Sequence, residues 1–168
     1  ELHANSLAEK MSRLGDGTFI PLHAPARVSS TLVRDELMKE ESVQDAVKLM
    51  NRIDVALVGI GYPNEHSAIK ATGYYKENEI ESLISRKAAG ELCMQFYDME
   101  GRTEPYVSDN AVIGMDIHRL CKVPCSVGIA GGKEKLSAIQ GAINGKYINV
   151  LITDTECARA LLSDEEEE

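Results

Sequence analysis

The feature that most constrains the fold is an apolar run between Ile53 and Gly61, with the sequence Ile-Asp-Val-Ala-Leu-Val-Gly-Ile-Gly. It is too short for a membrane-spanning helix, which needs about 20 apolar residues. Because it is almost continuously apolar, we expect a strand that is buried on both faces, as in a parallel sheet covered by helices. Further strands are predicted at 91–97, 126–130 and 148–153.

Segments with helical periodicity lie before and between these predicted strands. Their apolar residues recur every three or four positions, which gives each helix one face that can pack on a sheet. Strands that alternate with helices at this spacing indicate an α/β fold with a mostly parallel sheet and right-handed crossovers. The predicted helices cover residues 3–14, 29–38, 42–50, 77–87, 133–144 and 153–162.

Length and charge bound the class of protein. The 168 residues, 43% of them hydrophobic, are enough for one domain with its own core, which we place at residues 1–163. The net charge is −9, and the tail at 164–168 holds five acids, which leaves about −4 on the domain. An acidic domain without a basic run binds nucleic-acid phosphates and anionic membranes poorly, so we expect neither to be a direct partner of this chain.

The histidines and cysteines show no pattern of a metal or redox site. The four histidines are dispersed, without the spacing of metal ligands. The irregular spacing of the cysteines favours reduced thiols in a cytoplasmic protein that holds no metal or cofactor. The chain begins inside a helical pattern and without methionine, so we expect a fragment of a longer protein. The four cysteines are Cys93, Cys121, Cys125 and Cys157.

A glycine-rich turn, Gly59-Ile60-Gly61, ends the first predicted strand. Ligands of open parallel sheets bind beyond the carboxyl ends of the strands, where glycines let a ligand approach the backbone. A dinucleotide fingerprint would need a third glycine where the chain has Asn64, and Pro63 interrupts the expected turn into a helix. A tight turn and a ligand-binding loop are equally good interpretations of this segment. A nicotinamide dinucleotide is disfavoured as its ligand.

A second glycine turn follows a later predicted strand and leads into a helix, with the sequence Gly131-Gly132-Lys133-Glu134-Lys135. The N–H groups and the dipole at a helix N-terminus attract anions, and a lysine in the first turn indicates an anion that compensates its charge. The spacing is too short for a Walker A loop and no hydroxyl follows the lysine, so a simple phosphate ester is favoured over a nucleoside triphosphate. The alternative is a pair of solvated lysines.

Two acidic residues stand at the ends of predicted strands. Glu91 follows Gly90 where a strand begins, and it can accept hydrogen bonds from sugar hydroxyls or act as a base. An exposed carboxylate at the start of a strand is an equally good interpretation. Asp154 follows the last predicted strand, and we interpret it as the acid that opens the final helix.

Six short motifs occur in an order that is specific to one family. They are residues 56–61, Gly90-Glu91, residues 96–101, Val112-Ile113-Gly114, residues 128–135 and residues 149–154. Together they resemble the C-terminal effector-binding domain of SorC-type bacterial transcription regulators, which include the sorbitol, deoxyribonucleoside, central glycolytic and autoinducer-2 regulators. The resemblance covers nearly the whole chain. It implies a Rossmann-like α/β fold of the phosphosugar-isomerase type, related to glucosamine-6-phosphate deaminase and ribose-5-phosphate isomerase.

The resemblance also implies a ligand-sensing module rather than an enzyme. Domains of this family bind a phosphorylated sugar, which changes the oligomeric state of a dimeric or tetrameric regulator and its affinity for DNA. The DNA is held by a separate N-terminal helix-turn-helix. We expect Lys135 to contact the phosphate and Glu91 to face the sugar. The residues expected to bind the effector are Lys135, Glu91, Gly59, Ile60, Gly61, Gly131 and Gly132.

The sequence departs from the family in what it lacks. It has neither the helix-turn-helix nor the upstream part of the effector domain, where the family places a first strand and further phosphate loops. We therefore expect the chain to hold only part of the pocket. A phosphosugar isomerase or deaminase with Glu91 as base is the alternative function, and it ranks lower because no second acid or histidine is positioned by the sequence to assist it.

Overall fold

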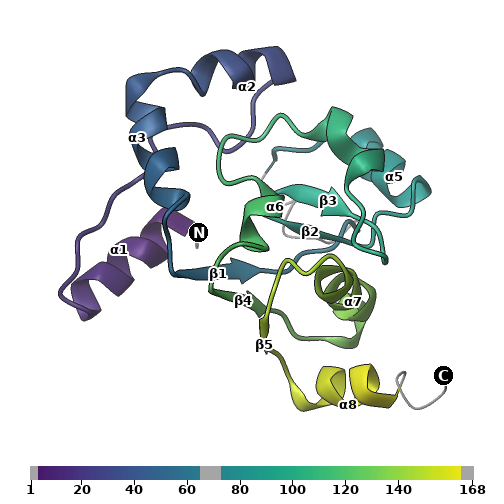
Figure 1. Ribbon diagram of the computed structural model, residues 1–168. Helices are drawn as coiled ribbons and strands as arrows, with labels where there is room; N and C mark the ends of the chain where they lie inside the picture. Colours follow the sequence, from purple (N-terminus) through teal and green to yellow (C-terminus); the bar gives the residue numbers. More distant parts are fainter. Residues whose placement is uncertain (1–3, 65–72, 164–168) are drawn as a thin grey trace.

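The computed structural model describes residues 4–64 and 73–163 (Figure 1). The predicted acidic tail at 164–168 lies outside the described residues. The strands are β1 Val55–Gly59, β2 Gly90–Leu92, β3 Gln95–Tyr97, β4 Cys125–Ile129 and β5 Val150–Ile152. The helices are α1 Ala4–Leu14, α2 Thr31–Leu37, α3 Glu41–Met50, α5 Glu77–Ser85, α6 Ile117–Leu120, α7 Leu136–Asn144 and α8 Thr155–Ser163, and the 3-10 helices are η1 Glu104–Asp109 and η2 Lys133–Lys135.

A three-stranded parallel sheet of order β1-β4-β5 forms the centre of the fold (Figure 1). Val55 of β1 pairs with Cys125 of β4, and Val127 of β4 pairs with Val150 of β5. The β4–β5 crossover passes through η2 and α7, as the alternation of strands and helices predicted. Because parallel strands end at one edge, the loops that follow all three strands meet there.

The inner face of the sheet forms the main core together with α6, α7 and β2. Ile139 and Ala142 of α7 are completely buried beside Leu92 of β2. Burying a side chain of the size of isoleucine contributes about 1.5–3 kcal/mol. The hydroxyl of Tyr97 donates to the carbonyl of Ala138 at 2.9 Å, which satisfies the one polar atom that this ring brings into the core.

The outer face of the sheet differs from the prediction. In the described part of the chain it is open, whereas the apolar run at 53–61 predicted burial on both faces. The alternation along β1 is the reason: Ala56 points into the core, while its neighbours point to the open side. The exposed aliphatic residues of this face are Val55, Leu57, Ile129, Val150 and Ile152, with relative exposures between 42% and 54%.

The single strand predicted at 91–97 is a hairpin instead. Strands β2 and β3 pair antiparallel, with Glu91 opposite Phe96, and the chain turns at Cys93 and Met94. Both turn residues have positive φ, of 52° and 61°. This conformation normally selects glycine or asparagine, so the sequence lacks the usual signal of a two-residue hairpin turn.

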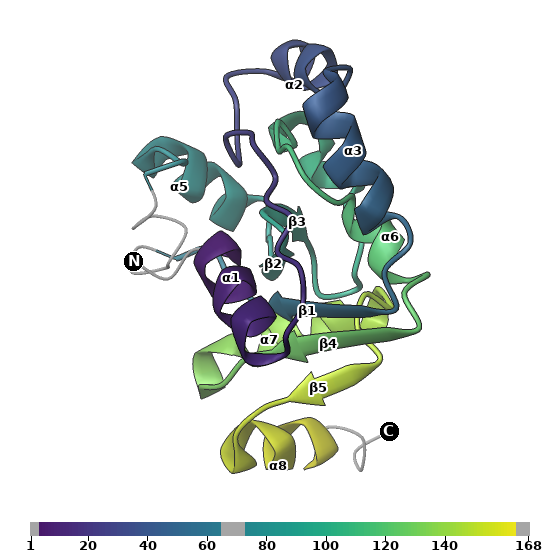
Figure 2. The same ribbon diagram turned by 90° about the vertical axis from the view of Figure 1, so that its left-hand side faces the viewer.

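Helices α2 and α3 form an arm beside α6 (Figure 2). Ser30 caps α2 by accepting a hydrogen bond from the backbone of Val33. Arg119 of α6 donates to the side chain of Asn51 at the end of α3, at 2.8 Å, and so joins the arm to the core. Over residues 4–64 and 73–163, every helix is too short or too polar to cross a membrane.

Candidate functional site

Lys135 lies at the carboxyl edge of the sheet, at the junction of η2 and α7. Its Nζ atom donates to the carbonyl oxygen of Ile60, the residue after β1, at 2.9 Å. The Ile60 side chain is 1% exposed and belongs to the core, so only its backbone faces the lysine. The ammonium group is therefore held against the end of β1 by a neutral acceptor.

Glu91 is fixed beside the same strand end. Its backbone exchanges two hydrogen bonds with Gly61, at 2.9 and 3.0 Å, which joins β2 to the loop after β1. Its carboxylate accepts a hydrogen bond from the backbone N–H of Met94 at 2.8 Å. A side chain at position 61 would overlap the Glu91 side chain, so Gly61 allows the carboxylate to lie where it does. The alternative of an exposed carboxylate at Glu91 is wrong.

Burial controls the charge of Glu91. Desolvation raises the pKa of its carboxyl from 4.5 to about 7, against the opposing effects of the Met94 amide and the positive charge of Lys135. At neutral pH the protonated and ionised forms are therefore present in comparable amounts. A carboxyl group in this state can either donate to or accept from a ligand hydroxyl.

The glycines after β4 are arranged differently from the expectation. The backbone N–H of Gly132, expected to face an anionic ligand, donates to Oδ2 of Asp154 at 2.7 Å. The other oxygen of Asp154 accepts from Cys157 at the start of α8, so the acid opens this helix as predicted. Gly131 lies against the same carboxylate. The N–H of Gly132 is thus already bonded to a carboxylate of the chain itself.

The structure therefore brings together only part of the predicted site. Lys135, Glu91, Ile60 and Gly61 meet at the end of β1. Gly59 lies on the exposed side of β1, and a Cβ built on it would meet nothing within 4 Å. Within the described residues, no three histidine, cysteine or acidic side chains could hold a metal ion.

A separate cleft of about 740 Å³ has the size of ligand pockets, but none of the residues expected to bind the effector lines it. Chain neighbours of the site line it: Tyr62 follows Gly61, and Glu134 precedes Lys135. Arg86 and Arg102 also line the cleft, and they form ion pairs with Asp109 and Asp98. Sequence reasoning missed this cleft because its lining residues come from segments that lie far apart in the chain.

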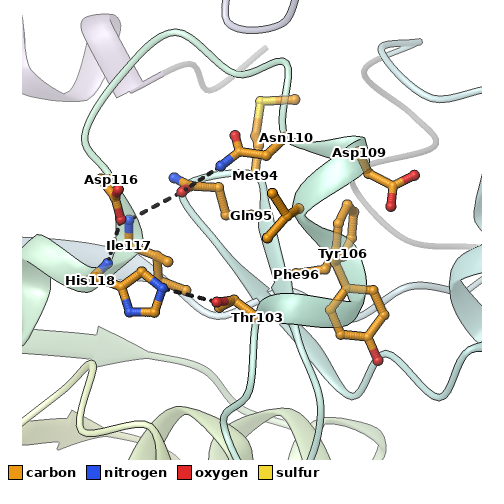
Figure 3. A pocket seen from close by; sticks show the side chains of 11 residues that line it. Met94, Gln95, Phe96, Thr103, Tyr106, Asp109, Asn110, Asp116, Ile117 and His118 are labelled. Atoms are coloured by element: carbon orange, nitrogen blue, oxygen red, sulfur yellow. Dashed lines mark hydrogen bonds between the residues drawn. The ribbon is translucent and has the colours of Figure 1, made fainter. Parts of the chain in front are cut away.

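A smaller cavity of about 170 Å³ lies between β3, η1 and α6 (Figure 3). The buried Gln95 forms one wall, where its Oε1 accepts from the backbone of Ile117 and its Nε2 donates to the carbonyl of Met115. His118 contacts the hydroxyl of Thr103 at 2.9 Å. Gln95 bonds to the backbone, and His118 and Thr103 bond to each other, so these side chains hold loops together rather than offer hydrogen bonds to a ligand.

Comparison with known proteins identifies the family. Residues 1–163 match the family model described as "Putative sugar-binding domain", so the chain belongs to this family. It is 34% identical over 138 residues to the sorbitol operon regulator of Klebsiella pneumoniae, covering 82% of this chain and 44% of the relative. It is 30% identical to the deoxyribonucleoside regulator of Bacillus subtilis, covering 87% of this chain and 46% of that protein. The chain thus spans less than half the length of these relatives.

Solved structures agree with the α/β assignment. The full-length sorbitol operon regulator from Klebsiella pneumoniae matches with a TM-score of 0.88 and 31% identity, over 95% of this chain and 52% of that chain. The structure described as "Putative Sugar-Binding Domain of Transcriptional Repressor" from Vibrio fischeri gives a TM-score of 0.88 and 26% identity, over 98% of this chain and 66% of that chain. The predicted fold class and the resemblance to SorC-type regulators are confirmed.

Proposed function

We propose that this chain is the effector-sensing part of a transcription regulator and that its effector is a phosphorylated sugar. The observation that carries the proposal is the meeting of Lys135 and Glu91 at the end of β1, where ligands of parallel sheets bind. DNA would be bound by another domain of a homo-oligomeric protein, because this acidic chain is itself a poor ligand for phosphate backbones.

The two side chains suit the two ends of such a ligand. The ammonium of Lys135 bonds to an uncharged carbonyl, and exchanging that acceptor for a phosphate oxygen replaces a neutral hydrogen bond with a charge-assisted one. The carboxyl of Glu91 can accept from or donate to a sugar hydroxyl, since its pKa of about 7 keeps both forms present.

Catalysis on the same ligand is the alternative function. The pKa of Glu91 favours it, because a general base works best when its pKa lies near the working pH. An isomerase or deaminase also needs a group that moves a second proton. Among the described residues, His118 is occupied with Thr103 in a separate cavity, so we rank binding above turnover. Aldose–ketose exchange or ammonia release would support catalysis.

A thermal-shift screen of the full-length protein tests the proposal. The probes are inorganic phosphate, fructose 1,6-bisphosphate, ribose 5-phosphate, deoxyribose 5-phosphate and hexose 6-phosphates, each phosphosugar beside its free sugar. A true effector at 100 times its Kd should stabilise the fold by about 2.7 kcal/mol. The free sugar should give a much smaller shift.

Lys135→Ala and Lys133→Ala form the matched pair of variants for this screen. Lys135→Ala should weaken phosphosugar binding by about 1.5–3 kcal/mol, the range for a hydrogen bond to a charged group. Lys133 is exposed and forms a long ion pair with Glu156 at 3.6 Å, so Lys133→Ala should bind normally. An equal response of Lys135→Ala and the unmodified protein, or no shift with any phosphosugar, would overturn the proposal.

A further inference from the structure

Asp154 joins two loops at the carboxyl edge of the sheet. One carboxylate oxygen accepts from Gly132, in the loop after β4, at 2.7 Å. The other accepts from Cys157, in the first turn of α8 after β5, at 2.8 Å. Capping of the α8 backbone uses the second oxygen, and the first meets α8 only through a long contact with the thiol of Cys157 at 3.5 Å, so its shorter bond to Gly132 requires a separate explanation.

Two glycines, Gly131 and Gly132, make room for the bond between Asp154 and Gly132. A Cβ on Gly131 would lie 2.8 Å from Oδ2 of Asp154, so a side chain there would push the carboxylate away. Gly132 has a φ of 102°, a conformation that residues with side chains rarely adopt. The two glycines predicted to cradle a ligand anion thus admit the carboxylate of Asp154.

Gly132 connects Asp154 to Lys135 through a single peptide turn. Its N–H donates to Asp154, and its carbonyl accepts from the backbone N–H of Lys135 at 2.9 Å. From this fixed turn the Lys135 side chain reaches the carbonyl of Ile60. The position of the lysine therefore depends on a turn that Asp154 holds in place.

We propose that Asp154 is a positioning residue of the effector site, which acts through Gly132 to place Lys135 for the ligand phosphate. This inference rests on the proposed function. It also gives the amide of Gly132 no direct part in binding the anion, because that amide is already bonded to a carboxylate. Hydrogen bonds from the amides of Cys157 and Gly132 lower the pKa of Asp154, which supports an ionised carboxylate at neutral pH.

The test is a double-mutant cycle on phosphosugar affinity, measured by calorimetry in the full-length protein with the phosphosugar that gives the largest thermal shift. Asp154→Ala alone should weaken binding roughly three- to thirtyfold, the range for residues that act through another group. In a Lys135→Ala background the same change should add less than about twofold, because a positioning residue loses its effect when its target is absent. Equal losses in both backgrounds would refute the proposal.

Two further variants separate positioning from general damage. Gly131→Ala breaks the same contact from the opposite side and should reproduce the affinity loss of Asp154→Ala. Glu156→Gln removes a neighbouring negative charge of α8 without touching Gly132, so its affinity should match that of the unmodified protein. Normal binding by Gly131→Ala, or a loss as large in Glu156→Gln, would contradict the assignment.

Amide hydrogen exchange provides a readout that needs no ligand. In Asp154→Ala the amide of Gly132 should exchange faster, because its acceptor is gone. If no phosphosugar binds the unmodified protein, the proposed function fails while this contact can still be confirmed. If phosphosugar binds but the exchange rate of Gly132 is unchanged in Asp154→Ala, the positioning role alone is refuted.

Discussion

Replacing Glu91 with glutamine should increase the free energy of unfolding at pH 8 and change it little at pH 4.5. The folded state raises the pKa of this carboxyl from 4.5 to about 7 through burial. Between pH 4.5 and about pH 7, Glu91 has lost its proton in the unfolded chain but keeps it in the folded chain. Stability therefore falls as the pH rises through this window.

The magnitude follows from the two pKa values. Each pH unit between them is worth about 1.4 kcal/mol, so ionisation of Glu91 costs the fold about 3 kcal/mol by pH 8. Glutamine carries no charge, and its side-chain oxygen can still accept the hydrogen bond from Met94. The variant should thus lack the pH-dependent loss without leaving this amide unpaired.

Urea unfolding of both proteins at pH 4.5 and pH 8 measures the effect. The difference in unfolding free energy between variant and unmodified protein should grow by about 2–3 kcal/mol from the lower to the higher pH. Glu104→Gln, which removes an exposed carboxylate, is the control and should show no such growth. A constant difference across the two pH values would refute the assignment of a raised pKa to Glu91.

Two further changes test the fold. Gly101→Ala should lower the free energy of unfolding by at least about 1–3 kcal/mol in urea titrations, because its φ is 78° and an added Cβ would overlap the backbone of Gly145. An unchanged midpoint would contradict that conformation. Gln95→Leu should cost about 1–3 kcal/mol by thermal unfolding, because the carbonyl of Met115 and the N–H of Ile117 lose their partner. Retained stability would show that the loop at 110–117 is held by other contacts.

Much of the fold could be predicted because its local signals agree with its tertiary structure. The apolar run at 53–61 and the glycine turns at strand ends led to the parallel sheet, and the helices begin and end within a few residues of their predicted limits. The hairpin was missed because Cys93 and Met94 adopt positive φ without being glycine or asparagine. Tertiary packing imposes that turn, so no local rule could predict it.

The candidate site was predictable in its chemistry but not in its pairing. Lys135 and Glu91 were selected as residue types beside strand ends, and the structure places both at the end of β1. The role of Asp154 toward Gly132 was not predictable, because the two residues are 22 positions apart and belong to different loops. A helix-opening acid that also bonds to a distant loop has no distinct sequence pattern.

The pairing of β1 with β4 also determines the order in which the site can assemble during folding. Val55 pairs with Cys125, 70 positions later, whereas Val127 pairs with Val150 after only 23. Closing the longer loop costs about 1 kcal/mol more in chain entropy, and such distant contacts form slowly. We therefore expect the β4–α7–β5 unit to form first and β1 to dock on it last. Because Ile60 arrives with β1, the lysine gains its backbone partner only when the domain is complete, and a partly folded chain has no finished site to offer a ligand.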